Sequence, residues 1–384
     1  MDFSPNETQQ LIADSARQFA DRVLAPRAVA LDREGGFPSD SLAQAAELGL
    51  LGINVPEELG GVEAGAVAYA LAVIELARAC ASTTVAMTVS NMVAEVITHF
   101  GTEEQKTEHV PKLCSGEYVV GGFALSESGA GSDPGGMLTR AVKTDRGWVM
   151  NGSKLWITSG TDAGLFVVWA RTNDAPGPRG ISAFLVRGDT PGLVRGKPEH
   201  KLGQHGSTTT PLEFHDMELP NEALLSEEGR GFRVAMMALD GGRIGISSLA
   251  LGCGGAALDC ARDYANERTQ FGQPISKFQA IQWMLADSAT ELEAARALVL
   301  RAAWLKEQKR RFTREASIAK LFTTEKAYAA CDRAIQVLGG YGYTREFPVE
   351  RYLRDVRVTR IFEGTSEIQR IVISRDVIRR FDKS

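Results

Sequence analysis

The spacing of apolar residues divides this chain into a helical part, a β part and a second helical part. Near the N-terminus, apolar residues recur every three or four positions, which is the spacing of an amphipathic helix. The first such run consists of Leu11, Ala16, Phe19, Ala20 and Val23. Pro26 interrupts it. Further helices are predicted, between Gly and Pro residues, at 41–50, 64–81, 85–100 and 103–114.

The pattern changes near Glu117, where short apolar or alternating runs replace the helical spacing. Clusters of Gly, Pro, Asn and Asp separate these runs, which is typical of an antiparallel β domain. Three of the five tryptophans, Trp148, Trp156 and Trp169, lie in this part. The predicted strands are 118–125, 147–151, 165–170, 181–187 and 212–219.

From Gly231 onward the spacing is helical again, with long segments near 231–266, 275–308 and 313–338. Long helices of this kind usually pack as a bundle. We therefore expect an α+β multidomain protein. Its predicted parts are an N-terminal α-helical domain over 1–118, a middle antiparallel β domain over 119–228 and a C-terminal helical bundle over 229–384.

Composition narrows the class of protein. A chain of 384 residues is too long for one simple core, so two or three domains are expected. The net charge of −5 argues against the basic surface that a nucleic-acid partner requires. The cysteines contain no C-x-x-C pair and indicate reduced core residues. They are Cys80, Cys114, Cys253, Cys260 and Cys331.

The N-terminal residues show neither the basic and apolar regions of a signal peptide nor the arginine content of a transit peptide. The longest uncharged runs, such as 79–94, are too short to span a bilayer. The sequence therefore predicts a cytoplasmic protein without a membrane segment. A mitochondrial matrix protein whose leader has been removed would show the same features.

Several familiar signatures are missing. The chain has no G-x-G-x-x-G after a strand, no P-loop and no G-x-S-x-G turn, which argues against a Rossmann site, a Walker phosphate site and a nucleophile elbow. Its five histidines do not follow zinc-ligand spacing. No metal site is predicted.

The segment 360–370 carries the most chemical information. It places Glu363 between an apolar pair and a glycine, just before the start of the last helix. Ser366 and Gln369 have the spacing of a capping box for that helix. A carboxylate in apolar surroundings has a raised pKa, which suits a general base near neutral pH. The alternative is an ordinary surface glutamate at a helix N-terminus.

Four other segments are candidates for ligand binding, and each has a plain structural alternative. The Gly-rich turn in 123–133 could line a polar cofactor or be a simple β-turn. The aromatic and hydroxyl residues in 154–158 could pack on a flat ring or belong to a β core. In 266–272, Arg268 could hold a phosphate or answer a helix dipole. The paired glycines in 336–342 could admit a ligand or end a helix.

Together, in this order on an α-β-α chain, these segments resemble the acyl-CoA dehydrogenase family from the first helix to the last. The resemblance implies that FAD is the cofactor and lies between the β domain and the C-terminal bundle. It implies an acyl-CoA substrate and an electron-transfer flavoprotein as electron acceptor. It also implies at least a dimer, and a homotetramer built as a dimer of dimers in most of the family.

The resemblance assigns roles to individual residues. Glu363 matches the family's catalytic base. The residues assigned to FAD are Phe123, Leu125, Ser126, Gly131, Ser132, Trp156, Thr158, Gly339, Thr365 and Glu367. Those that would reach FAD bound to a neighbouring subunit are Arg268, Gln270, Phe271, Gln336 and Gly340. The residues assigned to the substrate are Ser132, Asp240, Arg243, Phe362 and Gly364.

Some members of the family take the base from a helix position just before an arginine, but that position is Gly242 here. Glu363 is therefore the one candidate base. Two departures from the family pattern also stand out. Ser128 replaces a proline in the Gly-rich turn, and Phe362 replaces a tyrosine before the base, which removes a hydroxyl from the acyl site.

The predicted reaction is the FAD-dependent α,β-dehydrogenation of a short or short branched-chain acyl-CoA to the 2-enoyl-CoA, as in fatty acid or branched-chain amino acid catabolism. The segment 79–105 contains no Lys or Arg for a second carboxylate, which argues against a glutaryl substrate. The alternatives are an acyl-CoA oxidase, other flavin chemistry on the same fold, and a scaffold without activity.

Overall fold

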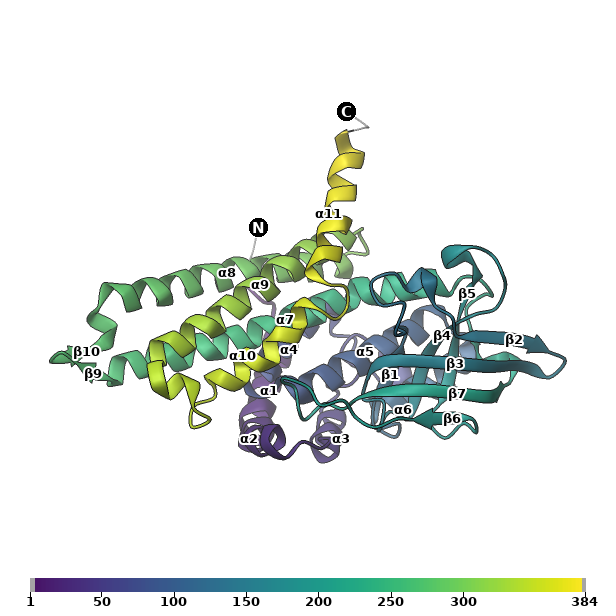
Figure 1. The fold of residues 1–384 in the computed structure, drawn as a ribbon, viewed down its shortest axis with the longest axis horizontal. Coiled ribbons are helices and arrows are strands. Elements are labelled where there is room, and N and C mark those ends of the chain that lie inside the picture. Colours follow the sequence, from purple (N-terminus) through teal and green to yellow (C-terminus); the bar gives the residue numbers. More distant parts are fainter. Residues whose placement is uncertain (1–3, 382–384) are drawn as a thin grey trace.

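The computed structural model describes residues 4–381, and these form helical, β and helical parts in chain order (Figure 1). Pro26 does not end the first helical run, contrary to expectation. It lies in the first turn of α2, where its missing N–H is tolerated, and a π-helical turn over 20–24 joins α2 to α1. The N-terminal helices are α1 Glu7–Phe19, α2 Ala25–Glu34, α3 Ser39–Glu47, α4 Gly65–Ala79, α5 Ala81–Phe100 and α6 Glu103–Cys114.

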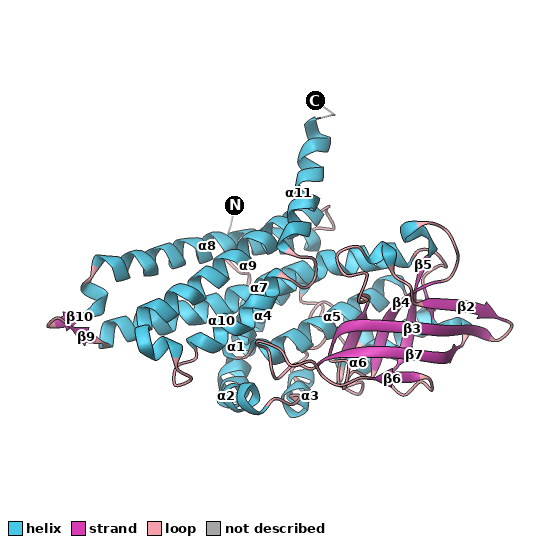
Figure 2. Cartoon of the chain, viewed as in Figure 1, coloured by secondary structure: helices cyan, strands magenta, loops and turns pink. Residues whose placement is uncertain are grey.

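The strands form one main sheet in the order β6-β7-β3-β2-β4-β5-β8, gathered at one end of the molecule (Figure 2). The sheet is mixed rather than antiparallel, because both β1 and β2 pair in parallel with β4, with Gly121 opposite Leu165 and Arg140 opposite Arg171. The strands are β1 Gly121–Ala124, β2 Arg140–Thr144, β3 Gly147–Thr158, β4 Leu165–Arg171, β5 Ile181–Arg187, β6 Leu193–Arg195, β7 Thr209–Leu219 and β8 Leu224–Leu225.

The three long C-terminal helices are present as predicted, and two shorter ones follow them. The second long helix begins later than expected because 275–277 form a 3-10 turn. The elements are α7 Gly231–Glu267, α8 Gln279–Glu307, α9 Thr313–Leu338, α10 Val349–Arg357 and α11 Ser366–Phe381, and the two short strands after α7 are β9 Thr269–Gln270 and β10 Gln273–Pro274.

Helix α7 organises the interior, because it packs against α4, α5, α8 and α9 and runs from the β domain to the β9–β10 hairpin (Figure 1). At its first residue, the carbonyl of Gly231 accepts a hydrogen bond of 2.8 Å from the buried indole of Trp169. Within residues 4–381, α7 alone is long and apolar enough to cross a membrane by length and composition. Its most apolar stretch is 72% buried in the protein, as in a core helix.

Candidate active site

Glu363 lies in the tight turn between a 3-10 turn at 358–360 and α11. Its φ of +52° and the φ of +90° at Gly364 are both left-handed, and such backbone is uncommon for a residue with a side chain. This turn aims the Glu363 carboxylate at α7. A Cβ added to Gly242 would overlap Glu363 Oε2. The missing side chain at position 242 therefore provides the space that the carboxylate occupies.

The Glu363 carboxylate is poorly solvated. Part of the residue reaches solvent, but Oε2 is inaccessible and accepts no hydrogen bond from residues 4–381. Desolvation raises the pKa of Glu363 to about 7, although the charges of Lys320 and Arg243 act in the opposite direction. The predicted increase in pKa is confirmed. An unpartnered carboxylate with this pKa can accept a proton near neutral pH.

Side chains from α9 and α11 hold the turn over 361–365, called the catalytic turn below, in place. The carbonyl of Gly364 accepts hydrogen bonds from Lys320 Nζ at 2.7 Å and from Gln369 Nε2 at 2.8 Å. The predicted capping box is wrong by one residue, since Thr365 Oγ1 accepts the N–H of Ile368 and is the N-cap. Gln369 turns back to the loop instead of capping the helix, because the Gly364 carbonyl is within its reach.

The face of α7 that lies beside Glu363 is lined with glycines. Cβ atoms at Gly241 and Gly245 would lie 3.1 Å from Lys306 Nζ and 2.6 Å from the hydroxyl of Tyr69. Together with Gly242, these residues let polar groups from α4, α8 and the catalytic turn approach the helix backbone. Such close approach is the usual structural reason for glycine inside a helix.

Two of the residues assigned to the substrate, Asp240 and Arg243, lie on the same part of α7 and form an ion pair of 2.7 Å. Arg243 Nη1 also contacts Ser317 at 3.3 Å, and Asp240 accepts a hydrogen bond of 2.6 Å from Thr313. Burial lowers the pKa of Arg243, and its Nε is buried without a hydrogen-bond partner in residues 4–381. The structure thus places Asp240 and Arg243 beside the catalytic turn. Arg243 Nε is available there to donate a hydrogen bond to a ligand.

The residues assigned to the flavin follow the ends of β1 and β3. Trp156 has φ +64° and lies where the pairing of β3 with β7 shifts, between Lys154 and Ile157. A bulge of this kind redirects a side chain, and the indole of Trp156 is 59% exposed near Thr158. A large exposed ring beside a hydroxyl is a suitable surface for a flat aromatic group. Phe123, Leu125 and Ser126 lie on β1 and the turn after it.

A buried ion pair, which the sequence analysis missed, fixes this turn. Lys154 Nζ lies 2.8 Å from Glu127 Oε1 and donates to the carbonyl of Leu125 at 3.1 Å. Glu127 also accepts the N–H groups of Leu138 and Thr139, at 2.6 and 3.0 Å. Burial lowers the pKa of Lys154 to about 8, although the negative charge of Glu127 acts in the opposite direction. No local pattern in the sequence marks this pair, because Glu127 lies between two serines and Lys154 follows Asn151, Gly152 and Ser153. Beyond the pair, Gly131 and Ser132 are exposed in the Gly-rich turn.

The second group of cofactor candidates lies at the opposite end of the molecule, around the β9–β10 hairpin (Figure 1). A cavity of about 480 Å³ lies there, between the ends of α7 and α9. Phe271 at the hairpin tip is 94% exposed, and Gln336 is exposed near the end of α9. The predicted residues that line the cavity are Arg268, Gln270, Gly339 and Gly340. Within a single chain, the cofactor candidates near β1 and β3 are therefore far from those around the hairpin.

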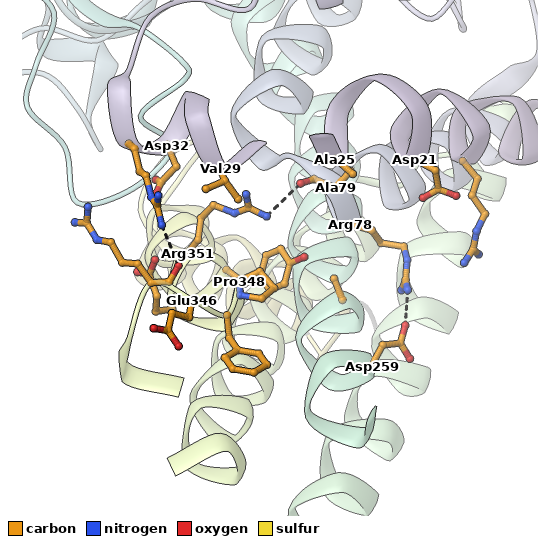
Figure 3. Close-up of a pocket in the computed structure, with 17 residues that line it drawn as sticks. Asp21, Ala25, Val29, Asp32, Arg78, Ala79, Asp259, Glu346, Pro348 and Arg351 are labelled. Carbon is orange, nitrogen blue, oxygen red and sulfur yellow. Dashed lines mark hydrogen bonds and ion pairs between the residues drawn. The ribbon is translucent and has the colours of Figure 1, made fainter. Parts of the chain in front are cut away.

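A further cavity of about 430 Å³ lies between α1, α2, α7 and α10 (Figure 3). None of the predicted site residues lines it. Arg78 pairs with Asp259 across it, and Arg351 donates to the carbonyl of Ala79 at 3.4 Å. Its arginines and carboxylates are balanced, so the cavity presents no net charge for an anion. Within residues 4–381, no group of three His, Cys, Asp or Glu side chains could hold a metal ion.

Comparison with known proteins identifies the family. The models of the acyl-CoA dehydrogenase N-terminal, middle and C-terminal domains match residues 6–117, 122–217 and 229–378. The chain belongs to the acyl-CoA dehydrogenase family. The predicted resemblance is thereby confirmed, and so is the three-domain fold, except that the sheet of the middle domain is mixed, with β1 and β2 parallel to β4.

The relatives of this acyl-CoA dehydrogenase cover nearly its whole length. The short-chain specific acyl-CoA dehydrogenase of Bos taurus mitochondria is 48% identical over 98% of this chain and 91% of its own. Butyryl-CoA dehydrogenase from Megasphaera elsdenii is 40% identical, with a TM-score of 0.96 over 98% of this chain and 100% of its own. A chain from structural work on the electron-transferring flavoprotein of Acidaminococcus fermentans is 43% identical, with a TM-score of 0.97 over 99% and 100%.

FAD is the cofactor of this family, and the enzyme is an oxidoreductase. The residues present fit this cofactor. The exposed indole of Trp156 and the fixed turn after β1 offer a flat apolar surface beside hydroxyl groups. The cavity lined by Arg268, Gly339 and Gly340 offers a cation and open backbone, which suit a diphosphate. Thr365 and Glu367 flank the start of α11 next to the catalytic turn.

Proposed function

We propose that this enzyme removes one hydrogen from Cα and one from Cβ of a short acyl-CoA and yields the 2-enoyl-CoA, with Glu363 as the base. One observation carries the proposal. The carboxylate oxygen Oε2 of Glu363 is buried, has no hydrogen-bond partner within residues 4–381 and lies against a glycine face. Such an oxygen is available for a proton and is protected from water.

The α-proton moves to Glu363 Oε2 as negative charge develops on the thioester oxygen. The backbone N–H of Glu363 donates no hydrogen bond within the described residues, so it can donate one to that oxygen. FAD, when bound, supplies the acceptor for the hydride that leaves Cβ. Arg243 and Asp240 hold the polar part of the substrate, and Gly364 permits the turn. Phe362, next to the base in sequence, lines a cavity of about 140 Å³ together with Thr158.

A short monocarboxylic acyl group fits the charges around the site. The segment 79–105 contains no Lys or Arg, but Lys306 on α8 reaches the glycine face of α7. Glu95 neutralises Lys306 through contacts of 2.6 and 2.9 Å, so this lysine is not available to a second carboxylate on the substrate. The names of the bovine and Megasphaera relatives agree with a short acyl chain. A step in fatty acid or branched-chain amino acid catabolism would supply such a thioester.

The arrangement of the two cofactor regions supports an oligomer. Because the β-domain surface and the hairpin cavity lie at opposite ends of one chain, a complete FAD site requires a second subunit (Figure 1). In a homotetramer made of two dimers, a neighbouring subunit can complete each of the four FAD sites. The Acidaminococcus neighbour supports an electron-transfer flavoprotein as the electron acceptor. Mitochondrial and bacterial relatives fit either a matrix or a cytoplasmic location.

The experiment is anaerobic mixing of the FAD-loaded enzyme with butyryl-, isobutyryl-, isovaleryl-, hexanoyl- and glutaryl-CoA, followed by flavin absorbance. We expect rapid bleaching by one of the short monoacyl thioesters and little by glutaryl-CoA. Bleaching by glutaryl-CoA alone would contradict the short-chain assignment. An acyl-CoA oxidase is the alternative, and fast reoxidation of the bleached enzyme by oxygen would reveal it.

A further inference from the structure

Lys320 is a buried cation that the reaction described above does not use. It lies in the middle of α9, and its side chain is fully buried. Its ammonium group has one hydrogen-bond acceptor within residues 4–381, the carbonyl of Gly364 at 2.7 Å. Burying an ammonium group is costly unless it is paired and hydrogen-bonded. The role of this buried lysine is therefore expected to lie in its contact with the catalytic turn.

The contact reaches the catalytic residue through one peptide group. Gly364 follows Glu363 directly, and both have left-handed φ angles. The Gly364 carbonyl is tied to α9 by Lys320 and to α11 by Gln369. A strained turn persists only when surrounding contacts hold it, so these two donors fix the direction in which the carboxylate points.

The charged groups around Lys320 and Glu363 come from several elements. Desolvation lowers the pKa of Lys320 to about 8, and the Glu363 carboxylate gives the largest opposing effect. In return, Lys320 gives the largest charge effect that lowers the pKa of Glu363. The other groups that face the pair are Arg243 on α7, Tyr69 on α4, Glu325 on α9 and Glu367 on α11.

We propose that Lys320 is a positioning residue for the dehydrogenation: its ammonium group ties the Gly364 carbonyl to α9 and places a positive charge beside the turn that carries Glu363. The inference rests on the proposed role of Glu363 as the base. It separates two contributions, a tether that any hydrogen-bond donor of similar length can supply and a charge that only a cation can supply.

Three variants of the FAD-loaded enzyme separate these contributions. Lys320→Gln keeps a neutral donor and removes the charge, Lys320→Met removes both, and Lys320→Arg keeps a cation. Lys326→Met is the matched control, because Lys326 lies on the same helix but pairs with Glu291 at 2.6 Å. The rate of flavin reduction by butyryl-CoA under anaerobic conditions is measured from pH 6 to pH 9, after gel filtration has shown that each variant keeps the wild-type oligomeric state.

The charge predicts a shift of the pH profile. Removing an opposite charge beside a carboxylate raises its pKa by roughly one unit or more. We therefore expect the midpoint of the rate profile to rise by about one pH unit in Lys320→Gln, with about fivefold slower reduction at pH 7 and recovery at pH 9. Lys320→Met should show the same shift and a lower rate at pH 9. Lys320→Arg and Lys326→Met should keep the wild-type midpoint.

A purely structural role for Lys320 gives a different result. In that case the folded variants lose rate equally at every pH, and the midpoint of Lys320→Gln equals that of the wild type. Such an outcome would overturn the inference even if the rates fell. If no acyl thioester reduces the wild-type flavin, the proposed function fails instead, so the two failures are distinguishable.

Discussion

Replacement of Glu363 by glutamine should stabilise the folded enzyme at alkaline pH and slow its reaction. The pKa of this carboxyl rises from 4.5 to about 7 on folding, because burial disfavours the charged form. The folded state therefore binds the proton more tightly than the unfolded state. The stability that this group contributes is fully present below pH 4.5 and is lost as the pH rises through 7.

The size of the effect follows from the difference between the two pKa values. One pKa unit corresponds to about 1.4 kcal/mol, so ionisation of Glu363 costs the folded state up to about 3 kcal/mol above pH 8. Partial exposure of the residue screens the charge, and we expect about 1–3 kcal/mol. Glutamine has nearly the same shape and no charge. The gain in Glu363→Gln should be absent near pH 4.5 and reach its maximum above pH 8.

The assay is thermal unfolding of the FAD-saturated wild type, Glu363→Gln and the control Glu228→Gln, which alters an exposed residue before α7. A change of 1 kcal/mol shifts Tm by about 2–4 °C in domains of 150–250 residues, so the increase should be a few degrees in this larger chain. The decisive quantity is the Tm difference between variant and wild type at pH 9 minus that at pH 5. A value of zero would refute the reasoning, because a pH-independent effect of the amide cancels in this comparison.

Three other changes test separate parts of the account. Gly242→Ala introduces a methyl group that overlaps Glu363 Oε2, so flavin reduction should slow by about 10²-fold while Gly136→Ala, whose methyl group meets no atom, stays near the wild type. Lys154→Met leaves Glu127 buried without its ion pair, which costs about 3–5 kcal/mol of stability. This variant should have a lower Tm and a lower affinity for FAD, measured by fluorescence titration. Unchanged values would show that the ion pair does not support the turn. Arg268→Ala should reduce the FAD content measured by absorbance, whereas full occupancy after dilution would argue against a role of the hairpin cavity in cofactor binding.

The helices were predictable because their apolar spacing is local. The ranges predicted for the three long C-terminal helices agree with α7, α8 and α9 within a few residues. The direction of β1 was not predictable, since alternation of apolar and polar residues is the same in parallel and antiparallel strands. The N-cap of α11 was misplaced because Thr365 and Ser366 are adjacent hydroxyl residues, and only the hydrogen bonds distinguish them.

Within the site, the base was predictable, but the groups that tune it were not. Glu363 has a recognisable local context, so its raised pKa could be anticipated from the apolar neighbours. Lys320 and Lys306 look like ordinary helix residues in the sequence. Their partners, Gly364 and Glu95, are 44 and 211 positions away along the chain. Only the folded structure shows that Lys320 is buried against the catalytic turn and that Lys306 on α8 pairs with Glu95 on α5.

The most direct test of the central claim is the rate of flavin reduction by butyryl-CoA, measured anaerobically in a stopped-flow instrument for the wild type and Glu363→Gln. Glu363 is the one carboxylate at the glycine face of α7 with an unpartnered buried oxygen in the described residues. We expect the variant to bind FAD normally and to reduce it at least about 10²-fold more slowly. Reduction at the wild-type rate would contradict the assignment of Glu363 as the base.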